Sequence, residues 1–189
     1  MRPNRLARPV ASAAFLRQLQ SPSRDQMVKK SAKDQPLDVN GRLSAGLRAV
    51  RDSAGLTLVA LAESTGMSRN TLWRIENRDA NARLSTIDAL AKFFKLNPTQ
   101  LFETAPSSTP RLPRRIALSK IVSGNIVVLR SGAGMSQEAL GQAAGLARNY
   151  VSLIEVTAPD LKIETVAGIA QVLNVDVSVL LADPREGLS

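Results

Sequence analysis

The chain contains neither cysteine nor histidine. This excludes disulfides, zinc sites built from Cys and His, thiolate nucleophiles and imidazole acid–base catalysis. Aromatic residues are only 3% of the 189 residues, so each core has to be aliphatic. No apolar run approaches the roughly 18 residues of a membrane span. No catalytic constellation stands out either, so we expect no enzyme, no cofactor, no metal and no membrane contact.

The net charge of +9 is unevenly distributed. Residues 1–44 carry nine basic and three acidic side chains, and residues 104–122 carry four basic and no acidic ones. Residues 123–182 carry three basic and five acidic side chains. A polyanion is a suitable partner, and nucleic acid is favoured over a membrane because no amphipathic basic helix stands out. The charge distribution by itself is equally consistent with a role in keeping the protein soluble.

One long pattern occurs twice. Residues from Leu47 to Phe102 recur from Ile126 to Leu181, at an offset of about 79 residues and without a gap. A repeat of this length indicates two copies of one domain rather than a solenoid of short units. The identities include Gly66/Gly145, Arg69/Arg148, Asn70/Asn149, Ile75/Ile154 and Glu76/Glu155.

The repeat and the composition divide the chain. We expect a basic, mostly disordered arm over residues 1–41, domain one over 42–103, a linker rich in Pro and Arg over 104–118, domain two over 119–182 and a tail over 183–189. The first 26 residues allow three interpretations: a flexible arm, an organelle transit segment, or a segment upstream of a translation start at Met27.

Helical spacing of the apolar residues predicts an all-α fold. In domain one we expect a first helix from near Leu43 to about Ser53, and Gly66 should end the second helix at a positive φ. The N-termini of the four later helices are expected at Thr57, Ser68, Ser85 and Asn97, the last followed by proline. In domain two we expect helices from Ser136, over Arg148–Glu155 and over Glu164–Leu173, with a turn at Gly145.

These elements suit a helix-turn-helix, which needs a scaffold helix, a tight turn and a second helix that reaches base edges. The segments TLVALAESTGMSRNTLWRIEN and SQEALGQAAGLARNYVSLIE have this form. With LSTIDALAKFFKLNPTQLF and IETVAGIAQVLNVDVSVLL behind them, they resemble the lambda-repressor-like, Xre-type helix-turn-helix proteins. The resemblance implies two tandem five-helix domains, double-stranded DNA as partner and transcription regulation or repression in a bacterial or phage setting, in the cytoplasm and at the nucleoid.

The resemblance also assigns DNA-facing positions. In domain one these are Thr57, Ser68, Arg69, Asn70, Thr71 and Arg74. In domain two they are Ser136, Gln137, Arg148, Asn149, Tyr150 and Ser152. Arginine can bond two acceptors of guanine and asparagine can do the same with adenine, while Gln137 occupies the family's phosphate-binding position. The linker side chains expected on phosphates are Arg111, Arg114 and Arg115.

The two copies differ where they should face DNA. Ser68 is replaced by Ala147 and Arg74 by Leu153, and domain two is net acidic. The covalent tandem is therefore either a pseudo-dimer on two adjacent major grooves, or a DNA reader whose domain two mainly binds protein. That second role includes homodimerisation and antitoxin-like or antiactivator-like capture of a partner. A dozen linker residues span at most about 40 Å, enough for half-sites roughly 34–36 Å apart.

Two glutamates that recur in the repeat and the single tryptophan also allow predictions. Glu76 and Glu155 are expected to pair with Arg51 and Arg130, which recur with them, rather than to act as catalytic carboxylates. Trp73 should lie on the exposed side of its helix, where it contacts either DNA or a neighbouring domain.

Overall fold

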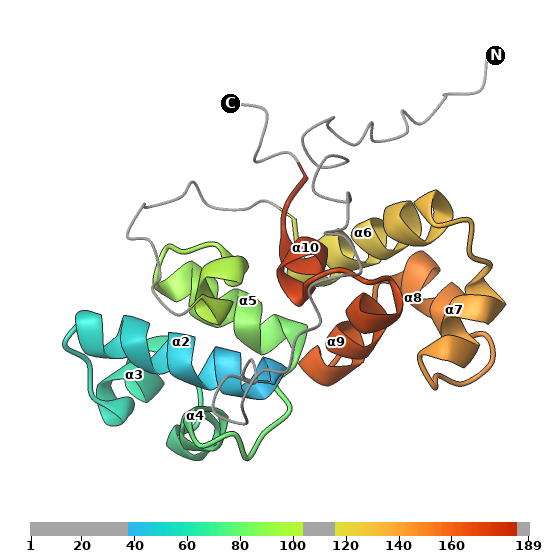
Figure 1. Cartoon of the computed structure of the whole chain (residues 1–189). Coiled ribbons are helices and arrows are strands. Elements are labelled where there is room, and N and C mark those ends of the chain that lie inside the picture. Colours follow the sequence, from blue (N-terminus) through green and yellow to red (C-terminus); the bar gives the residue numbers. More distant parts are fainter. Residues whose placement is uncertain (1–37, 104–115, 185–189) are drawn as a thin grey trace, which may run out of the picture.

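The computed structural model describes residues 38–103 and 116–184 (Figure 1). Within these ranges all the regular elements are helices, and there is one isolated β-bridge in addition. The predicted all-α class is therefore confirmed. The described part of the chain contains no helix that is both long and apolar enough to cross a membrane. The expected arm before Asp38 and the central linker residues 104–115 lie outside the described residues.

Domain one begins with a helix that starts earlier than predicted. The Asp38 carboxylate accepts the Gly41 N–H at 2.6 Å, and this cap starts the helix at Val39 instead of near Leu43. The elements of domain one are α2 (Val39–Ser53), α3 (Leu58–Thr65), α4 (Arg69–Glu76), α5 (Leu84–Phe93) and the 3-10 helix η2 (Pro98–Phe102).

Domain two repeats this order of elements. Its helices are α6 (Leu118–Gly132), α7 (Gln137–Ala143), α8 (Tyr150–Thr157), α9 (Ile163–Val172) and α10 (Val177–Leu181). The prediction that the third helix of this domain starts at Arg148 is wrong, because α8 starts at Tyr150. Ala147 stands at its Ser68-equivalent position and has no side-chain oxygen to fix an earlier first turn.

The predicted turns of both helix-turn-helix segments are confirmed. Thr57 accepts the Ala60 N–H at 3.1 Å, and Ser136 accepts that of Ala139 at 3.0 Å. The turn glycines have φ of 70° at Gly66 and 65° at Gly145, in the left-handed region where a side chain would be strained.

The prediction that Ser85 caps the fourth helix of domain one is wrong. The N-cap residue of α5 is Arg83, whose side chain makes no cap hydrogen bond. The acceptor comes from domain two instead, because Asp160 Oδ1 accepts the Ser85 N–H at 2.8 Å and Oδ2 accepts its hydroxyl at 2.7 Å. A side chain of the neighbouring domain therefore does what a local cap would do.

The same arrangement occurs in the opposite direction. The N-cap residue of α9 is Lys162, again without a side-chain cap bond. Asn81 of domain one accepts the Glu164 N–H at 3.2 Å and donates to the Glu164 carboxylate at 2.7 Å. Asn81 and Asp160 occupy equivalent positions of the repeat, as do Ser85 and Glu164. We call these two contacts the reciprocal caps.

A two-residue bridge lies between the reciprocal caps. Arg83 and Lys162, equivalent in the repeat, form an antiparallel β-bridge. On either side, the Leu84 N–H donates to the Leu161 carbonyl at 2.9 Å and the Ile163 N–H donates to the Ala82 carbonyl at 2.8 Å. Leu84 is equivalent to Ile163 in the repeat, and Ala82 is equivalent to Leu161, so each of the two bonds is the counterpart of the other. A pseudo-twofold axis therefore passes through the bridge.

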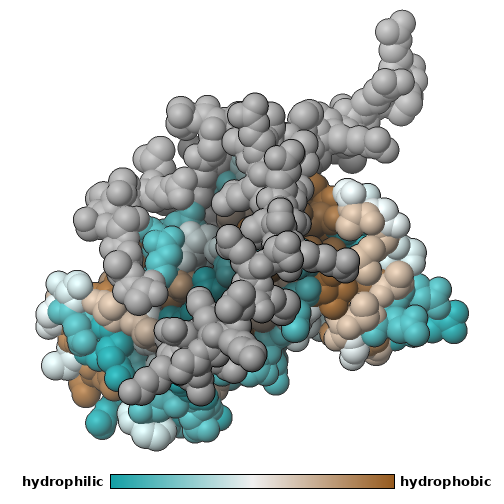
Figure 2. All heavy atoms as spheres, in the orientation of Figure 1, coloured by the Kyte–Doolittle hydropathy of each residue, from teal (hydrophilic) through white to brown (hydrophobic). Residues whose placement is uncertain are grey.

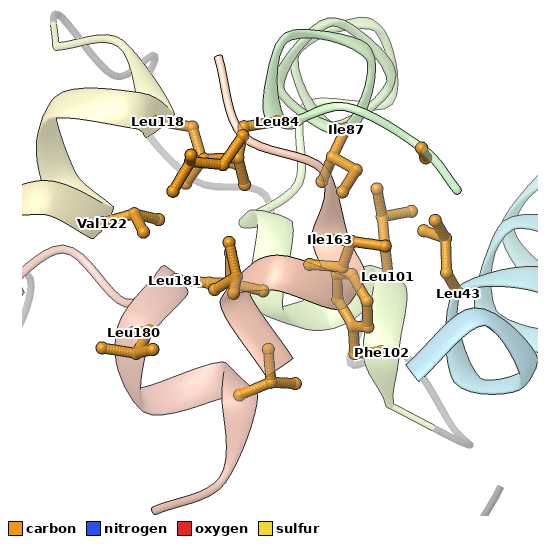
Figure 3. Close-up of a cluster of buried hydrophobic side chains, with 14 of the residues drawn as sticks. Leu43, Leu84, Ile87, Leu101, Phe102, Leu118, Val122, Ile163, Leu180 and Leu181 are labelled. Atoms are coloured by element: carbon orange, nitrogen blue, oxygen red, sulfur yellow. The ribbon is translucent and has the colours of Figure 1, made fainter. Parts of the chain in front are cut away.

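The apolar core continues across this axis. Helix α2 contacts α9 while its counterpart α6 contacts α5, and η2 contacts α10. Figure 3 shows side chains of both domains gathered in one cluster. Its equivalent pairs, each residue at most 2% exposed, are Leu43/Val122, Leu84/Ile163, Leu101/Leu180 and Phe102/Leu181. The two domains therefore form one body rather than two separate units on a linker.

Candidate nucleic-acid interface

The first turn of α4 carries the polar side chains predicted for domain one. Ser68 accepts the Thr71 N–H at 3.0 Å, and the two hydroxyls lie 2.8 Å apart. Arg69 and Asn70 follow this cap, and both are exposed. Leu72 is buried on the opposite side of the helix. The cap and the core together hold a guanidinium and an amide at the exposed N-terminal end of α4.

Arg74 is directed to the loop that follows α4. Its Nη2 donates to the Asp79 carbonyl at 2.7 Å, and its Nε lies 3.3 Å from the Asp79 carboxylate. The Asp79 N–H returns a bond to the Arg74 carbonyl at 2.8 Å. The sequence interpretation treated Arg74 as a DNA contact and missed this role in holding the loop.

A buried ion pair supports the helix-turn-helix in each domain, as predicted. Arg51 Nε lies 2.6 Å from Glu76 Oε1, and Arg130 Nε lies 2.6 Å from Glu155 Oε1. The hydrogen bond with Glu76 raises the pKa of Arg51. Burial alone would raise the pKa of Glu155, but hydrogen bonds from Arg130 and Gln137 lower it. The predicted phosphate ligand Gln137 donates to Glu155 at 2.7 Å, so part of its donor capacity is used inside the domain.

The predicted residues of domain two are arranged differently from those of domain one. Arg148 and Asn149 lie in the turn before α8, and Asn149 has a left-handed φ of 70°. Arg148 Nη2 is 3.7 Å from the Glu138 carboxylate, and both side chains are highly exposed. Tyr150 and Ser152 are half-buried. Domain two thus places a carboxylate beside its exposed arginine, which opposes phosphate binding there.

The outer face of α8 is more apolar than that of α4. Leu153 is 47% exposed and Val156 is 79% exposed, whereas the equivalent residues of domain one are Arg74 on α4 and Asn77 at its C-cap. In Figure 2 the surface over α4 is mostly hydrophilic, while hydrophobic residues reach the surface over α6 and α8. Trp73 is 48% exposed on α4, which confirms the side predicted for it.

A pocket of about 460 Å³ lies where α4 and its loop meet domain two. Its charged lining comes from both domains: Arg74, Arg78 and Asp79 from one, Lys162 and Glu164 from the other. Arg78 has a φ of 60°, so the loop turns sharply there. Sequence reasoning missed Arg78 and Lys162, because they come together only through the contact between domains.

The remaining predicted contacts fall outside this surface. Arg111, Arg114 and Arg115 belong to the linker that the structure does not describe. Over the two described ranges, no group of three or more Cys, His, Asp or Glu side chains is arranged to hold a metal ion.

Comparison with known proteins identifies both domains. Residues 42–103 match the family described as "Helix-turn-helix domain", and residues 129–180 match the family described as "Helix-turn-helix". The two matches together cover more than half of the chain, which therefore belongs to the helix-turn-helix DNA-binding proteins and carries two Xre-type domains in tandem.

The chain was also compared with curated proteins and with solved structures. No curated protein matches the chain. A solved structure titled "Crystal Structure of hypothetical transcription factor NHTF from Neisseria" is similar at 31% identity, with a TM-score of 0.38. The similarity covers 42% of this chain and 92% of that chain.

Proposed function

We propose that the protein is a sequence-specific transcriptional regulator that places α4 in the major groove of double-stranded DNA. The observation that supports this is the exposed pair Arg69 and Asn70 in the first turn of α4. Among the described residues neither side chain is held by a hydrogen bond or an ion pair, so both are available to base edges. Each well-formed contact with guanine or adenine contributes about 1–3 kcal/mol of discrimination.

Thr57, Ser68, Thr71 and Ser136 support these contacts in the proposal. Their hydroxyls sit at helix N-termini, where backbone N–H groups and the helix dipole favour phosphate oxygens. Such contacts fix the protein on the duplex without reading its sequence. In this role the protein works at the nucleoid, in the cytoplasm of a bacterium or of a phage-infected cell.

Selection from a random duplex library tests the proposal. The full chain should enrich one motif, and the Arg69→Ala/Asn70→Ala variant should lose the bases that these residues read. Lys92→Ala removes a positive charge from α5 instead and should leave the motif unchanged. The proposal fails if the wild-type chain enriches no sequence.

A second function is favoured by the exposed Leu153 and Val156 on α8. In this alternative, domain two mainly binds protein, through dimerisation or capture of a partner. Leu153→Ser/Val156→Ser should then convert a dimer of the full chain to a monomer in sedimentation, or release a co-purifying partner, while motif selection stays unchanged. A wild-type chain that is monomeric and purifies alone would count against this alternative.

A further inference from the structure

The two domains meet through the segments that follow α4 and α8, the recognition helices of the two helix-turn-helix motifs. Helix α4 leads into the segment around Ala82, and α8 leads into the segment around Leu161; these segments pair at the bridge. Figure 1 shows α4 and α8 on either side of the α5 and α9 pair. The pseudo-twofold axis relates α4 to α8, as the axis of a symmetric helix-turn-helix dimer relates the two recognition helices that enter the half-sites of one duplex.

The contact that relates the domains is extensive and specific. It combines the reciprocal caps, two backbone hydrogen bonds at the bridge and the buried cluster of Figure 3. A close-packed interior does not deform continuously, and backbone bonds fix the register between the segments. The separation of α4 and α8 is therefore set by the folded chain rather than by the length of a linker.

The same contact excludes a second copy of the chain from this position. Leu43, Leu84, Leu101 and Phe102 of domain one are buried in the cluster that domain two completes. A homodimer built around domain one would need these residues free. Domain two thus takes the place that an identical subunit would occupy in a symmetric dimer.

The reading surfaces on the two sides of the axis are not identical. Where α4 and its scaffold helix have Val59, Ser68 and Arg74, domain two has Glu138, Ala147 and Leu153. Arg148 and Asn149 precede α8, whereas Arg69 and Asn70 lie within α4. A palindromic site requires two identical readers, and this chain presents two different ones.

We infer that a single chain occupies one non-palindromic DNA site, in which two unlike half-sites are held at one fixed spacing. Domain one reads its half-site with Arg69 and Asn70 in the first turn of α4. Domain two reads a different half-site with Arg148 and Asn149 in the turn before α8. This inference rests on the proposed DNA-binding function.

Binding titrations with the site selected by the full chain test the inference. Native mass spectrometry should find one chain per duplex. A five-base-pair insertion between the half-sites turns one of them to the opposite face and should weaken binding about 100-fold, as expected for loss of a tethered second contact. Replacing the domain-two half-site with an inverted copy of the domain-one half-site should weaken binding as well.

The outcomes separate the inference from the proposed function. Two chains on a palindrome, or equal affinity at several spacings, would overturn the inference while DNA recognition stands. A chain that selects no sequence would overturn both. A second variant checks the asymmetry directly: Ala147→Ser/Leu153→Arg should make the two selected half-sites more alike, and an unchanged motif would argue that these positions do not read DNA.

Discussion

Asp160 of domain two caps α5 of domain one, with its Oδ1 accepting the backbone N–H of Ser85 at 2.8 Å. Helix N-termini leave backbone N–H groups without partners inside the helix, and α5 has no side-chain cap of its own. Asn81 returns the contact to α9. Each domain therefore completes a helix of the other, and we expect the tandem to unfold as one cooperative unit.

Removing this cap should weaken the whole chain. We expect Asp160→Ala to lower the free energy of unfolding by about 0.5–2 kcal/mol, the usual range for loss of an N-cap. Asp160→Asn keeps an acceptor oxygen and should lose much less. Urea denaturation measures both variants. Two separate transitions in the wild-type chain, with only one of them moved by Asp160→Ala, would contradict a single cooperative unit.

The local features of the fold could be predicted, and the contacts between domains could not. Thr57, Ser68 and Gly66 are visible in the sequence because a cap or a turn glycine acts on residues close to it. Ser85 was misread for the same reason: its position suits a local cap, and its partner lies 75 residues away. The sequence offered one hint of these contacts: Asn81 and Asp160, both good helix-capping residues, occupy equivalent positions of the repeat.

The candidate site shows the same limit. The paired Arg51 and Glu76 were predicted because both recur in domain two. The start of α8 was misplaced because repetition of Arg148 and Asn149 suggested equal structure, whereas the loss of the serine cap changes their backbone. Lys162 was missed because it belongs to domain two and reaches the pocket beside α4 only when the two domains are packed together.

A close contact between α2 and η2 gives a second prediction. A Cβ atom on Gly46 would collide with the Leu101 carbonyl oxygen, so Gly46→Ala should destabilise the chain by about 1–3 kcal/mol. Gly124→Ala in α6 is the matched control. Nothing lies within 4 Å of its Cβ position, and it should stabilise by about 0.4–1 kcal/mol. Equal melting temperatures for the two variants would show that the α2 contact has been misplaced.

The free energy of unfolding should depend on pH through Asp176, which forms an ion pair with Arg42 of domain one at 2.7 Å. Burial alone would raise the pKa of Asp176, but hydrogen bonds from Arg42 and Ser178 lower it to about 2. Its unfolded pKa is near 3.9. A depressed pKa adds stability that is present above about pH 4 and lost as the pH falls through 2.

The Asp176→Asn variant isolates this effect. Since the Asp176 side chain is 51% exposed, the difference from wild type should stay below about 1 kcal/mol at neutral pH. It should shrink steadily between pH 4 and pH 2 in denaturation series. A difference that grew over this interval would have the wrong sign for the account.

The cations beside the bridge predict a salt-dependent contribution to DNA binding. Arg78 and Lys162 lie in the pocket between the domains, near the centre of the proposed site. Arg78→Ala and Lys162→Ala should each weaken binding to all sequences alike, and each should reduce the slope of log affinity against log salt by about 0.9. Lys92→Ala on α5 is the control. A changed sequence preference in either variant would point to base contacts instead.

The absence of cysteine allows a direct test of the central claim that both domains of one chain meet one duplex. Asn77→Cys at the C-cap of α4 and Val156→Cys on α8 are substitutions at equivalent, exposed positions, and each cysteine can carry a single iron chelate that cleaves nearby DNA. On the selected site, the account predicts one cleavage centre for each variant, on the same face of the DNA and at a constant separation. Cleavage from Asn77→Cys alone, with none from Val156→Cys, would contradict it and assign domain two to another partner.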